Sequence, residues 1–347
     1  MNFTHVDTLL RNGVESHAYT SANILVGRGD EILFRAAYGK NSIEDDAQPT
    51  TLDTRYDMAS MTKNLSVGMI ALRALEKGLI ALADPISLYF DVPEDKKEIT
   101  VKHLLTHTGC FHPSLPLWQM NLKPEEVAPA ILNAPLIGKP GTEVHYSCMG
   151  FILMGKILEK VYGMPLNELA QQEVFGPLGM KDTGFLPEGG NIAATEMQPD
   201  GKCLVGVVHD ENARSMGGVS GNAGVFSTAD DCAKYAQMLV RGGLLPDGTR
   251  YLSKATLDAA MKNQTPGLGE ARGLAFYLPA YETSYVGDLF PITTFGHTGF
   301  TGTSYAIDPV TGVYLILLAN RVCPTREDPQ FMRIRRLVHN AVYAAVI

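Results

Sequence analysis

Cysteine is scarce in this 347-residue chain, and the few cysteines form no pattern. Their number is odd, and no two of them stand in a Cys-x-x-Cys arrangement. This argues against a disulfide framework and against a structural zinc site. We therefore expect free thiols in a reducing compartment. The cysteines are Cys110, Cys148, Cys203, Cys232 and Cys323.

Long apolar runs and clusters of positive charge are also missing. The longest apolar run spans residues 313–319, which is far too short to cross a bilayer. Residues 1–7 lack the regions of a signal peptide, so the sequence predicts a cytoplasmic protein, or a periplasmic or secreted one if a leader has been removed. The formal net charge is −8, and the basic residues gather only at 333–336, so we expect no nucleic-acid or membrane partner.

The composition is that of an ordinary globular protein, with 45% hydrophobic and 19% charged residues. Strand patterns and a flanking helix stand at both ends of the chain, and a mainly helical block lies between them. We therefore expect an α/β (α+β) fold: one antiparallel sheet built from both chain ends, flanked by helices, with an inserted helical domain. The predicted sheet domain is 1–57 with 264–347, and the predicted insertion is 58–263, together forming one unit. The sheet domain's predicted elements are helices 3–12 and 329–346, and strands 21–26, 31–37, 273–278, 293–296, 302–307 and 312–319.

The motif Ser60-Met61-Thr62-Lys63 stands at the start of a predicted helix. Apolar residues between 65 and 75 recur with helical spacing, and Gly78 is placed to end the helix. Lys63, one turn after Ser60, lies on the same helix face and could shift the proton of the serine. The N-terminus of the helix favours a developing negative charge at Ser60. The pattern alone also fits a capping serine beside a solvated lysine.

A second motif, Tyr146-Ser147-Cys148, lies in a tight segment before another predicted helix. A tyrosine near a lysine is pushed towards phenolate, because a positive neighbour favours the charged form. Tyr146 could then act as general base for Ser60 and as general acid for a leaving group. Taken alone, the residue fits a half-buried aromatic better.

A third motif, His297-Thr298-Gly299, lies between two predicted strands and has further glycines on either side. Such glycines let a ligand approach the backbone, and an edge strand can bind a substrate amide by strand addition. A backbone N–H here could face that of Ser60 across an acyl oxygen. A polar strand residue at a bend is the plain alternative. The sequence 209–211 (His-Asp-Glu) could suggest metal ligands, but polar loop contacts explain it more simply.

Together, the three motifs resemble those of the serine β-lactamase and penicillin-binding-protein family, in its class C-like branch that includes esterases. Order and spacing agree as well as the short patterns, and the resemblance covers about residues 18 to 345. It implies a β-lactamase/transpeptidase-like fold and acyl transfer through a serine ester, with no metal and no cofactor. The supporting stretches are 104–109 (LLTHTG), 174–180 (VFGPLGM) and 224–229 (GVFSTA).

The resemblance also implies roles for individual residues. Ser60 would be the acylated nucleophile, Lys63 would lower its proton affinity, and Tyr146 would be the main proton carrier. The backbone N–H groups of Ser60 and Phe300 would form the oxyanion hole. The strand at 297–299 would bind the substrate.

Two residues depart from the pattern of the family. Cys148 stands where the family usually has asparagine, and a thiol cannot replace the hydrogen bonds of an amide. The resemblance places His297 with Cys148 in the substrate site. His297 stands where β-lactamases usually have lysine, and histidine is only partly charged near neutral pH. We therefore expect an esterase or amide hydrolase with weak or no β-lactamase activity.

Two alternatives remain open at this stage. One is a D,D-peptidase, a D-aminopeptidase or a muropeptide amidase, which the stretch 209–213 followed by Gly217-Gly218 favours weakly through the same resemblance. The other is a non-catalytic ligand sensor that keeps the acyl-enzyme fold, which Cys148 motivates. In each case the expected partner is a small ester, amide or peptide, and the sequence assigns no oligomeric state.

Overall fold

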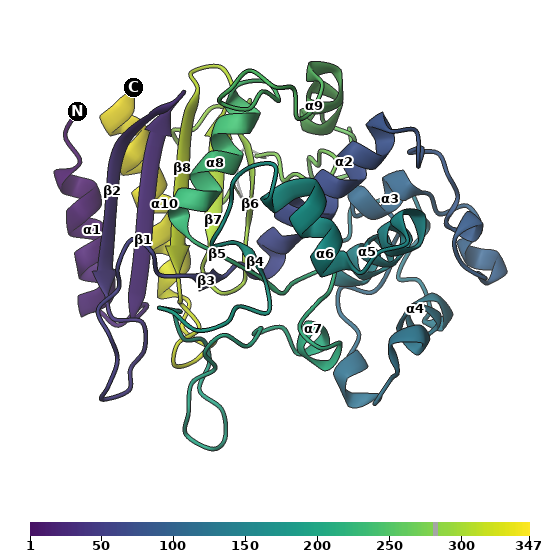
Figure 1. The fold of residues 1–347 in the computed structure, drawn as a ribbon, viewed down its shortest axis with the longest axis horizontal. Helices are drawn as coiled ribbons and strands as arrows, with labels where there is room; N and C mark the ends of the chain where they lie inside the picture. Colours follow the sequence, from purple (N-terminus) through teal and green to yellow (C-terminus); the bar gives the residue numbers. More distant parts are fainter. Residues whose placement is uncertain (280–283) are drawn as a thin grey trace.

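A computed structural model describes residues 1–279 and 284–347 of the chain. Its centre is a five-stranded antiparallel sheet with the strand order β2-β1-β8-β7-β6. Two strands come from the start of the chain and three from its end, so the predicted sheet from both chain ends is present and the fold class is confirmed (Figure 1). The strands are β1 (Ser21–Arg28), β2 (Glu31–Gly39), β6 (Phe295–Thr298), β7 (Ser304–Asp308) and β8 (Val313–Ala319).

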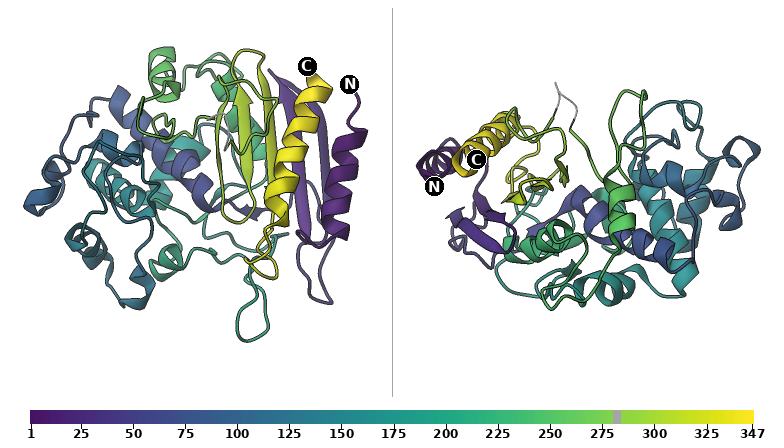
Figure 2. Two further views of the ribbon diagram at one scale, coloured as in Figure 1. Left: turned by 180° about the vertical axis from the view of Figure 1, so that it is seen from behind. Right: turned by 90° about the horizontal axis from the view of Figure 1, so that it is seen from above.

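Helices cover both faces of this sheet. Helices α1 (Thr4–Glu15) and α10 (Gln330–Val346) lie side by side on one face, and α8 (Ala229–Val240) lies on the other (Figures 1 and 2). The side chains of β8 alternate between the two: Leu315 and Leu317 pack with α1 and α10, whereas Ile316 packs with the helical block. A strand that is buried on both faces reads as a continuous apolar run, which explains the pattern at 313–319.

The helical block lies beside the sheet and follows the first two strands in the sequence (Figure 2). No helix in the described residues is both long and apolar enough to cross a membrane. The block also contains a small sheet of β3 (Tyr56–Asp57), β5 (Val225–Ser227) and β4 (Gly184–Phe185). Its remaining helices are α2 (Met69–Glu76), α3 (Val101–Leu105), α4 (Pro124–Asn133), α5 (Cys148–Tyr162), α6 (Leu166–Ala170), α7 (Glu211–Ser215) and α9 (Lys254–Met261).

The helix expected after Ser60 is present but begins irregularly. Residues 59–61 form a 3-10 turn, residues 63–68 form a π-helix, and α2 continues from residue 69. Wide π turns are rare and often occur at functional sites. Gly68 lies in this wide turn, where an added Cβ would come 2.5 Å from the Cβ of Ala275. The absence of a side chain at Gly68 therefore allows close packing against the segment around residue 275.

The strand predicted at 273–278 is wrong. This segment forms a tight turn in which only single bridges join Arg272 to Tyr277 and Tyr277 to Gly296. Ala275 has a positive φ of 64°, which no strand residue adopts. The backbone N–H groups of residues 274 and 275 bond to the ends of α9 and α3 instead of to a strand. The apolar residues are buried as the pattern indicates, but their backbone partners belong to helices.

Candidate active site

The Ser60 turn follows directly on β3, which ends at a buried carboxyl group. The Asp57 side chain accepts the backbone N–H of Ala59 at 2.8 Å and that of His209 at 2.7 Å. Ala59 has a positive φ of 45°, a strained conformation for a residue with a side chain. The hydrogen bonds of Asp57 therefore hold a sharp turn that leaves Ser60 partly exposed while residues 56–59 are buried.

Asp57 is a positioning residue that the sequence patterns do not single out. Burial raises the pKa of its carboxyl group to about 6, although the N–H groups of His209 and Ala59 lower it. A signal exists in the sequence, because an aspartate often accepts the N–H of the residue two positions later in a turn. Through Ala59, this carboxyl group fixes the backbone next to Ser60.

The structure brings Lys63 and Ser60 together. The Lys63 ammonium donates to Ser60 Oγ at 3.0 Å and to the backbone carbonyl of Asn222 at 3.0 Å, and its nitrogen lies 3.5 Å from Cys148 Sγ. Burial alone would lower the pKa of this fully buried lysine, but Cys148 and Tyr146 outweigh burial and raise the pKa above its usual value. Lys63 is therefore a buried cation with three acceptors around it.

The ring of Tyr146 lies near two cations. Its ring centroid is 5.1 Å from Lys63 Nζ and 5.5 Å from the guanidinium carbon of Arg272. His107 packs against the same ring with centroids 4.4 Å apart, and its Nδ1 accepts the N–H of Ser147 at 3.0 Å. Burial, together with both cations, holds the pKa of His107 well below its usual value, so this imidazole is neutral. The sequence patterns predict neither of the contacts made by His107 and Arg272.

His297 and Thr298 end strand β6, which is the edge strand of the large sheet. On its open side, Gly296 pairs with Tyr277 through two backbone hydrogen bonds of 2.9 and 3.1 Å. Alternate residues of a strand direct their backbone groups to the same edge, so Thr298 is the next residue on that side. His297 Nδ1 donates to the Thr298 carbonyl at 2.8 Å. The end of this edge is suited to pair with an extended substrate.

The imidazole of His297 is neutral rather than partly charged. Burial, together with the charge of Lys63, lowers the pKa of His297 to about 3. A neutral imidazole can donate or accept a hydrogen bond, but it cannot attract a carboxylate by charge. The position that carries lysine in β-lactamases therefore supplies no positive charge in this chain.

A tight loop after β6 is clamped onto the segment that precedes Ser60. The hydroxyl of Thr301 donates to the Asp57 carbonyl at 2.7 Å, and that of Thr303 donates to the Met58 carbonyl at 3.2 Å. Gly299 leaves no room for a side chain, because an added Cβ would come 2.5 Å from the Met58 carbonyl oxygen. Phe300, whose N–H is predicted to face that of Ser60, lies within this loop.

The 209–211 segment forms an ion-pair network rather than an open cluster of ligands. His209 Nε2 is 3.2 Å from Glu196, and the Arg326 guanidinium binds Glu196 at 2.8 Å and Glu211 at 2.6 Å. The ring of His209 stacks on that of Phe300 with centroids 5.8 Å apart. This arginine therefore engages both carboxylates, and the polar contacts expected as the simpler interpretation are present.

A paired serine and lysine beside an edge strand, in a sheet with an inserted helical block, define a serine hydrolase built like the penicillin-recognising enzymes. A family model described as Beta-lactamase matches residues 6–339, and the chain belongs to that family. This agrees with the resemblance that the three motifs indicate.

Known relatives and solved structures support the same assignment. Proteins named "Putative D-alanyl-D-alanine carboxypeptidase" from Escherichia coli K12 and Salmonella typhimurium LT2 are each 31% identical to this chain. The matches cover 90% and 91% of this chain and 81% and 82% of those proteins. Among solved structures, EstCE1, described as a hydrolase with promiscuous acyltransferase activity, has a TM-score of 0.78 at 20% identity and covers 98% of this chain and 97% of its own. The octameric penicillin-binding protein homologue from Pyrococcus abyssi has a TM-score of 0.77 at 20% identity, over 97% and 77% of the two chains.

Proposed function

We propose that this chain is an esterase or amide hydrolase that works through an acyl-enzyme on Ser60, with weak or no β-lactamase activity. The observation that carries the proposal is the 3.0 Å contact between Ser60 Oγ and a buried lysine. A buried ammonium stabilises a developing negative charge strongly, because little solvent screens it. That charge appears on Ser60 Oγ as the hydroxyl loses its proton.

In the proposed mechanism, Ser60 Oγ attacks the carbonyl carbon of the substrate. Its proton passes to Tyr146, which then returns a proton to the leaving alcohol or amine. The N–H groups of Ser60 and Phe300 bind the negative oxygen of the tetrahedral intermediate. Water then attacks the Ser60 ester, and the same groups act in reverse. The clamp between the 299–303 loop and residues 57–58 supports this arrangement, because it ties both proposed N–H donors to one rigid unit.

The proposed substrate order places short-chain esters above penicillins and cephalosporins. Cys148 offers Lys63 a weak sulfur acceptor at 3.5 Å in place of an amide oxygen. The neutral His297 cannot add the charge that β-lactamases place on this strand. A rate with nitrocefin comparable to that with p-nitrophenyl acetate would contradict this order.

The decisive experiment is covalent labelling. A fluorophosphonate probe is expected to add its mass to one peptide, the one that contains Ser60, and Ser60→Ala is expected to abolish both labelling and ester turnover. Full labelling and full turnover in Ser60→Ala would overturn the proposal. A burst of product without steady-state turnover in the unmodified protein would instead favour a ligand sensor.

A second candidate, a D-alanyl-D-alanine carboxypeptidase, is favoured by the names of relatives that are 31% identical over most of the chain. This activity uses the same acyl-enzyme chemistry on an amide bond. Release of D-alanine from a peptide that ends in D-Ala-D-Ala, lost in Ser60→Ala, would support it. Ester turnover without any D-alanine release would leave esterase activity as the supported function.

A further inference from the structure

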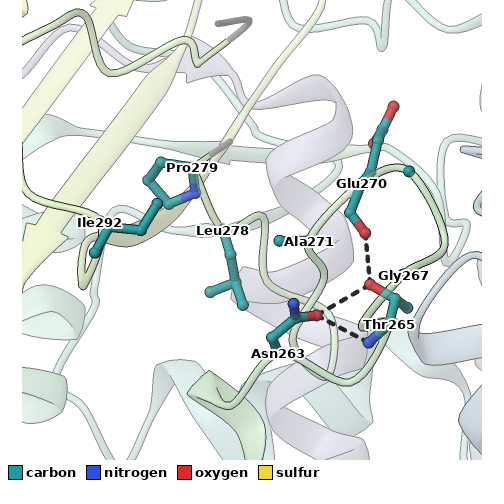
Figure 3. Close-up of a pocket in the computed structure, with 9 residues that line it drawn as sticks. Asn263, Thr265, Gly267, Glu270, Ala271, Leu278, Pro279 and Ile292 are labelled. Carbon is teal, nitrogen blue, oxygen red and sulfur yellow. Dashed lines mark hydrogen bonds between the residues drawn. The ribbon is translucent and has the colours of Figure 1, made fainter. Parts of the chain in front are cut away.

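A cavity of about 450 Å³ lies next to the end of α9, but the polar groups around Thr265 in it already bond to one another (Figure 3). The Thr265 hydroxyl donates to the Glu270 carbonyl at 2.6 Å and accepts the N–H of Arg272 at 3.0 Å. No cysteine or histidine is among the lining residues that the structure describes. Outside the Ser60 centre, reactive side chains meet instead at a pair of thiols, those of Cys203 and Cys323.

The two sulfur atoms lie 3.9 Å apart in a small buried cluster that also holds Ala194. Only 9% of Cys203 and 2% of Cys323 are exposed. Their contact joins two segments that are 120 positions apart in the chain. Cys203 and Cys323 are therefore placed to react with each other. The three remaining thiols contact oxygen or nitrogen atoms instead, those of Lys139, Ser227 and Lys63.

The backbone holds the two segments together. Cys203 ends a hairpin, residues 197–203, whose ends meet in a single bridge and which projects from the molecule (Figures 1 and 2). The N–H of Met197 donates to the Pro324 carbonyl at 2.9 Å, and the Asn320 side-chain amide donates to the Ala194 carbonyl at 3.0 Å. The hairpin and the 320–326 loop are thus already aligned beside the thiol pair.

The pair is reduced in the structure and needs only a small movement to close. A disulfide bond is about 2 Å long, so the two sulfurs must approach each other further. The hairpin can supply this movement, because residues 199–202 are exposed. Burial raises the pKa of both thiols, to about 12 for Cys323, so both are protonated at neutral pH and react only when an oxidant is in excess.

We propose that Cys203 and Cys323 form a reversible disulfide in the presence of hydrogen peroxide, and that this bond fastens the 197–203 hairpin to the 320–326 loop. The inference does not depend on the Ser60 chemistry, because neither thiol takes part in it.

Cys203, the more exposed of the two thiols, reacts first. Its sulfur attacks one oxygen of the peroxide, so that an S–O bond forms, the O–O bond breaks and one water leaves, which gives a sulfenic acid. The Cys323 sulfur then attacks the Cys203 sulfur, so that the S–S bond forms, the S–O bond breaks and a second water leaves. Two thiols and one peroxide thus become one disulfide and two waters, with the sulfurs oxidised and the peroxide oxygens reduced.

The bond would join two segments that hold the surroundings of Phe300. Glu196, directly before the hairpin, binds Arg326 at 2.8 Å and lies 3.2 Å from His209, whose ring stacks on that of Phe300. A cross-link between positions so far apart in the chain also restricts the unfolded state strongly. Oxidation is therefore expected to stabilise this corner of the molecule.

The test maps the thiols of the full chain before and after treatment with peroxide. The reduced protein is exposed to increasing hydrogen peroxide, the remaining thiols are blocked with iodoacetamide in denaturant, and the peptides are analysed without reductant. We expect one cross-linked pair, containing Cys203 and Cys323, which dithiothreitol separates. Cys110→Ser, which removes another buried thiol, is the matched control and should keep the cross-link, whereas Cys203→Ser should lose it.

Two further readouts test the order of the steps and the fastening of the hairpin. Dimedone, which labels sulfenic acids, should label Cys203 in the Cys323→Ser variant and should leave Cys323 unlabelled in Cys203→Ser; the reverse result would overturn the order. Tryptic cleavage after the exposed Lys202 should slow several-fold on oxidation and recover with dithiothreitol, because cleavage requires the hairpin to open. An unchanged cleavage rate in the cross-linked protein would overturn the fastening.

Methionine oxidation shows that the peroxide has reached the protein. Met120, which is 52% exposed, should be converted to its sulfoxide. Full alkylation of both Cys203 and Cys323 in protein that carries this sulfoxide would overturn the inference, as would a cross-link of either thiol to a different cysteine. Because this mapping uses the unmodified protein, it decides the inference even if a serine variant does not fold.

Discussion

Lys63, which contacts Ser60, and Arg326, which lies beside the Phe300 ring, are two cations whose surroundings differ. Lys63 is fully buried and is surrounded by a serine oxygen, a backbone carbonyl and a thiol. Arg326 is partly exposed and binds two carboxylates, Glu196 and Glu211. A paired cation neutralises its partners and stabilises the loops that carry them. Burying a cation without a carboxylate partner costs folding free energy. Such a cation is therefore retained mainly at sites where its charge takes part in catalysis.

The first prediction removes Tyr146 and Lys63 as functional groups and has the largest expected effect. Tyr146→Phe keeps the ring and removes the hydroxyl, and it should lower ester turnover by a factor of about 100 or more, the usual size of an acid–base contribution. Lys63→Ala should cost a similar factor. Because the two groups act as one unit in the proposed proton relay, the double variant should lose far less than the product of the two losses.

Thermal unfolding of Tyr146→Phe serves as the control, and its midpoint should stay close to that of the unmodified protein. Strictly multiplicative losses in the double variant would mean that Lys63 and Tyr146 act independently, and the proposed proton relay would have to be abandoned.

The second prediction concerns Asp57, a buried anion that backbone N–H groups satisfy. Its pKa of about 6 in the folded protein exceeds the ordinary value of 3.8, so the folded state binds the proton more tightly than the unfolded state. The contribution to stability is therefore greatest below pH 3.8 and falls as the pH rises towards 6. The unfolding free energy, relative to that of Asp57→Asn, should drop by up to about 3 kcal/mol over that range.

Chemical unfolding of both proteins at several pH values measures this difference. Subtracting the Asp57→Asn curve removes the titration of all other carboxylates, as long as they behave alike in the two proteins. A difference that stays flat, or that grows with pH, would mean that the two N–H donors outweigh burial and that Asp57 is an ordinary ionised aspartate.

Local spacing was enough to predict that Lys63 meets Ser60, because Lys63 is one turn further along the chain. The sheet built from both chain ends was also predictable, since alternation and turn residues mark its strands. Contacts between distant segments were not predictable from the sequence. Asp57 meets the backbone of His209, and His107 meets Ser147, across separations that no local pattern encodes.

The wrong prediction of a strand at 273–278 shows a second limit of reading structure from sequence patterns. Leu274 and Phe276 are buried, so the apolar pattern is correct about their environment. Hydrophobic periodicity records burial, but it does not record which backbone groups pair. Here the partners are helix ends, and the resulting turn is what places Arg272 beside Tyr146.

The third prediction changes an acceptor of Lys63 without removing the cation. Cys148→Asn replaces a sulfur at 3.5 Å by an amide that can accept a charge-assisted hydrogen bond. We expect the rate with nitrocefin, relative to that with p-nitrophenyl acetate, to rise about tenfold, which corresponds to one hydrogen bond to a charged group. Cys148→Ala is the matched control and should not raise the ratio. Equal ratios in both variants would show that the thiol does not limit β-lactam hydrolysis.

The last prediction breaks the Arg326 network and has the smallest expected effect. Arg326→Gln should lower the unfolding free energy by about 1 kcal/mol, because its ion pairs are only partly buried. Arg11→Gln, which removes an exposed pair with Asp7, is the matched control and should cost less. Chemical unfolding measures both.

The pH dependence of this loss should run opposite to that of Asp57. Hydrogen bonds from Arg326 lower the pKa of Glu196 and Glu211 despite their partial burial, so these carboxylates stabilise the fold above pH 4.5. That stability disappears as the pH falls through their lowered pKa values, and the difference between Arg326→Gln and the unmodified protein should shrink with it. A difference that is constant down to pH 3 would mean that Arg326 acts through packing against Phe300, whose ring centroid lies 6.0 Å from its guanidinium carbon, rather than through charge.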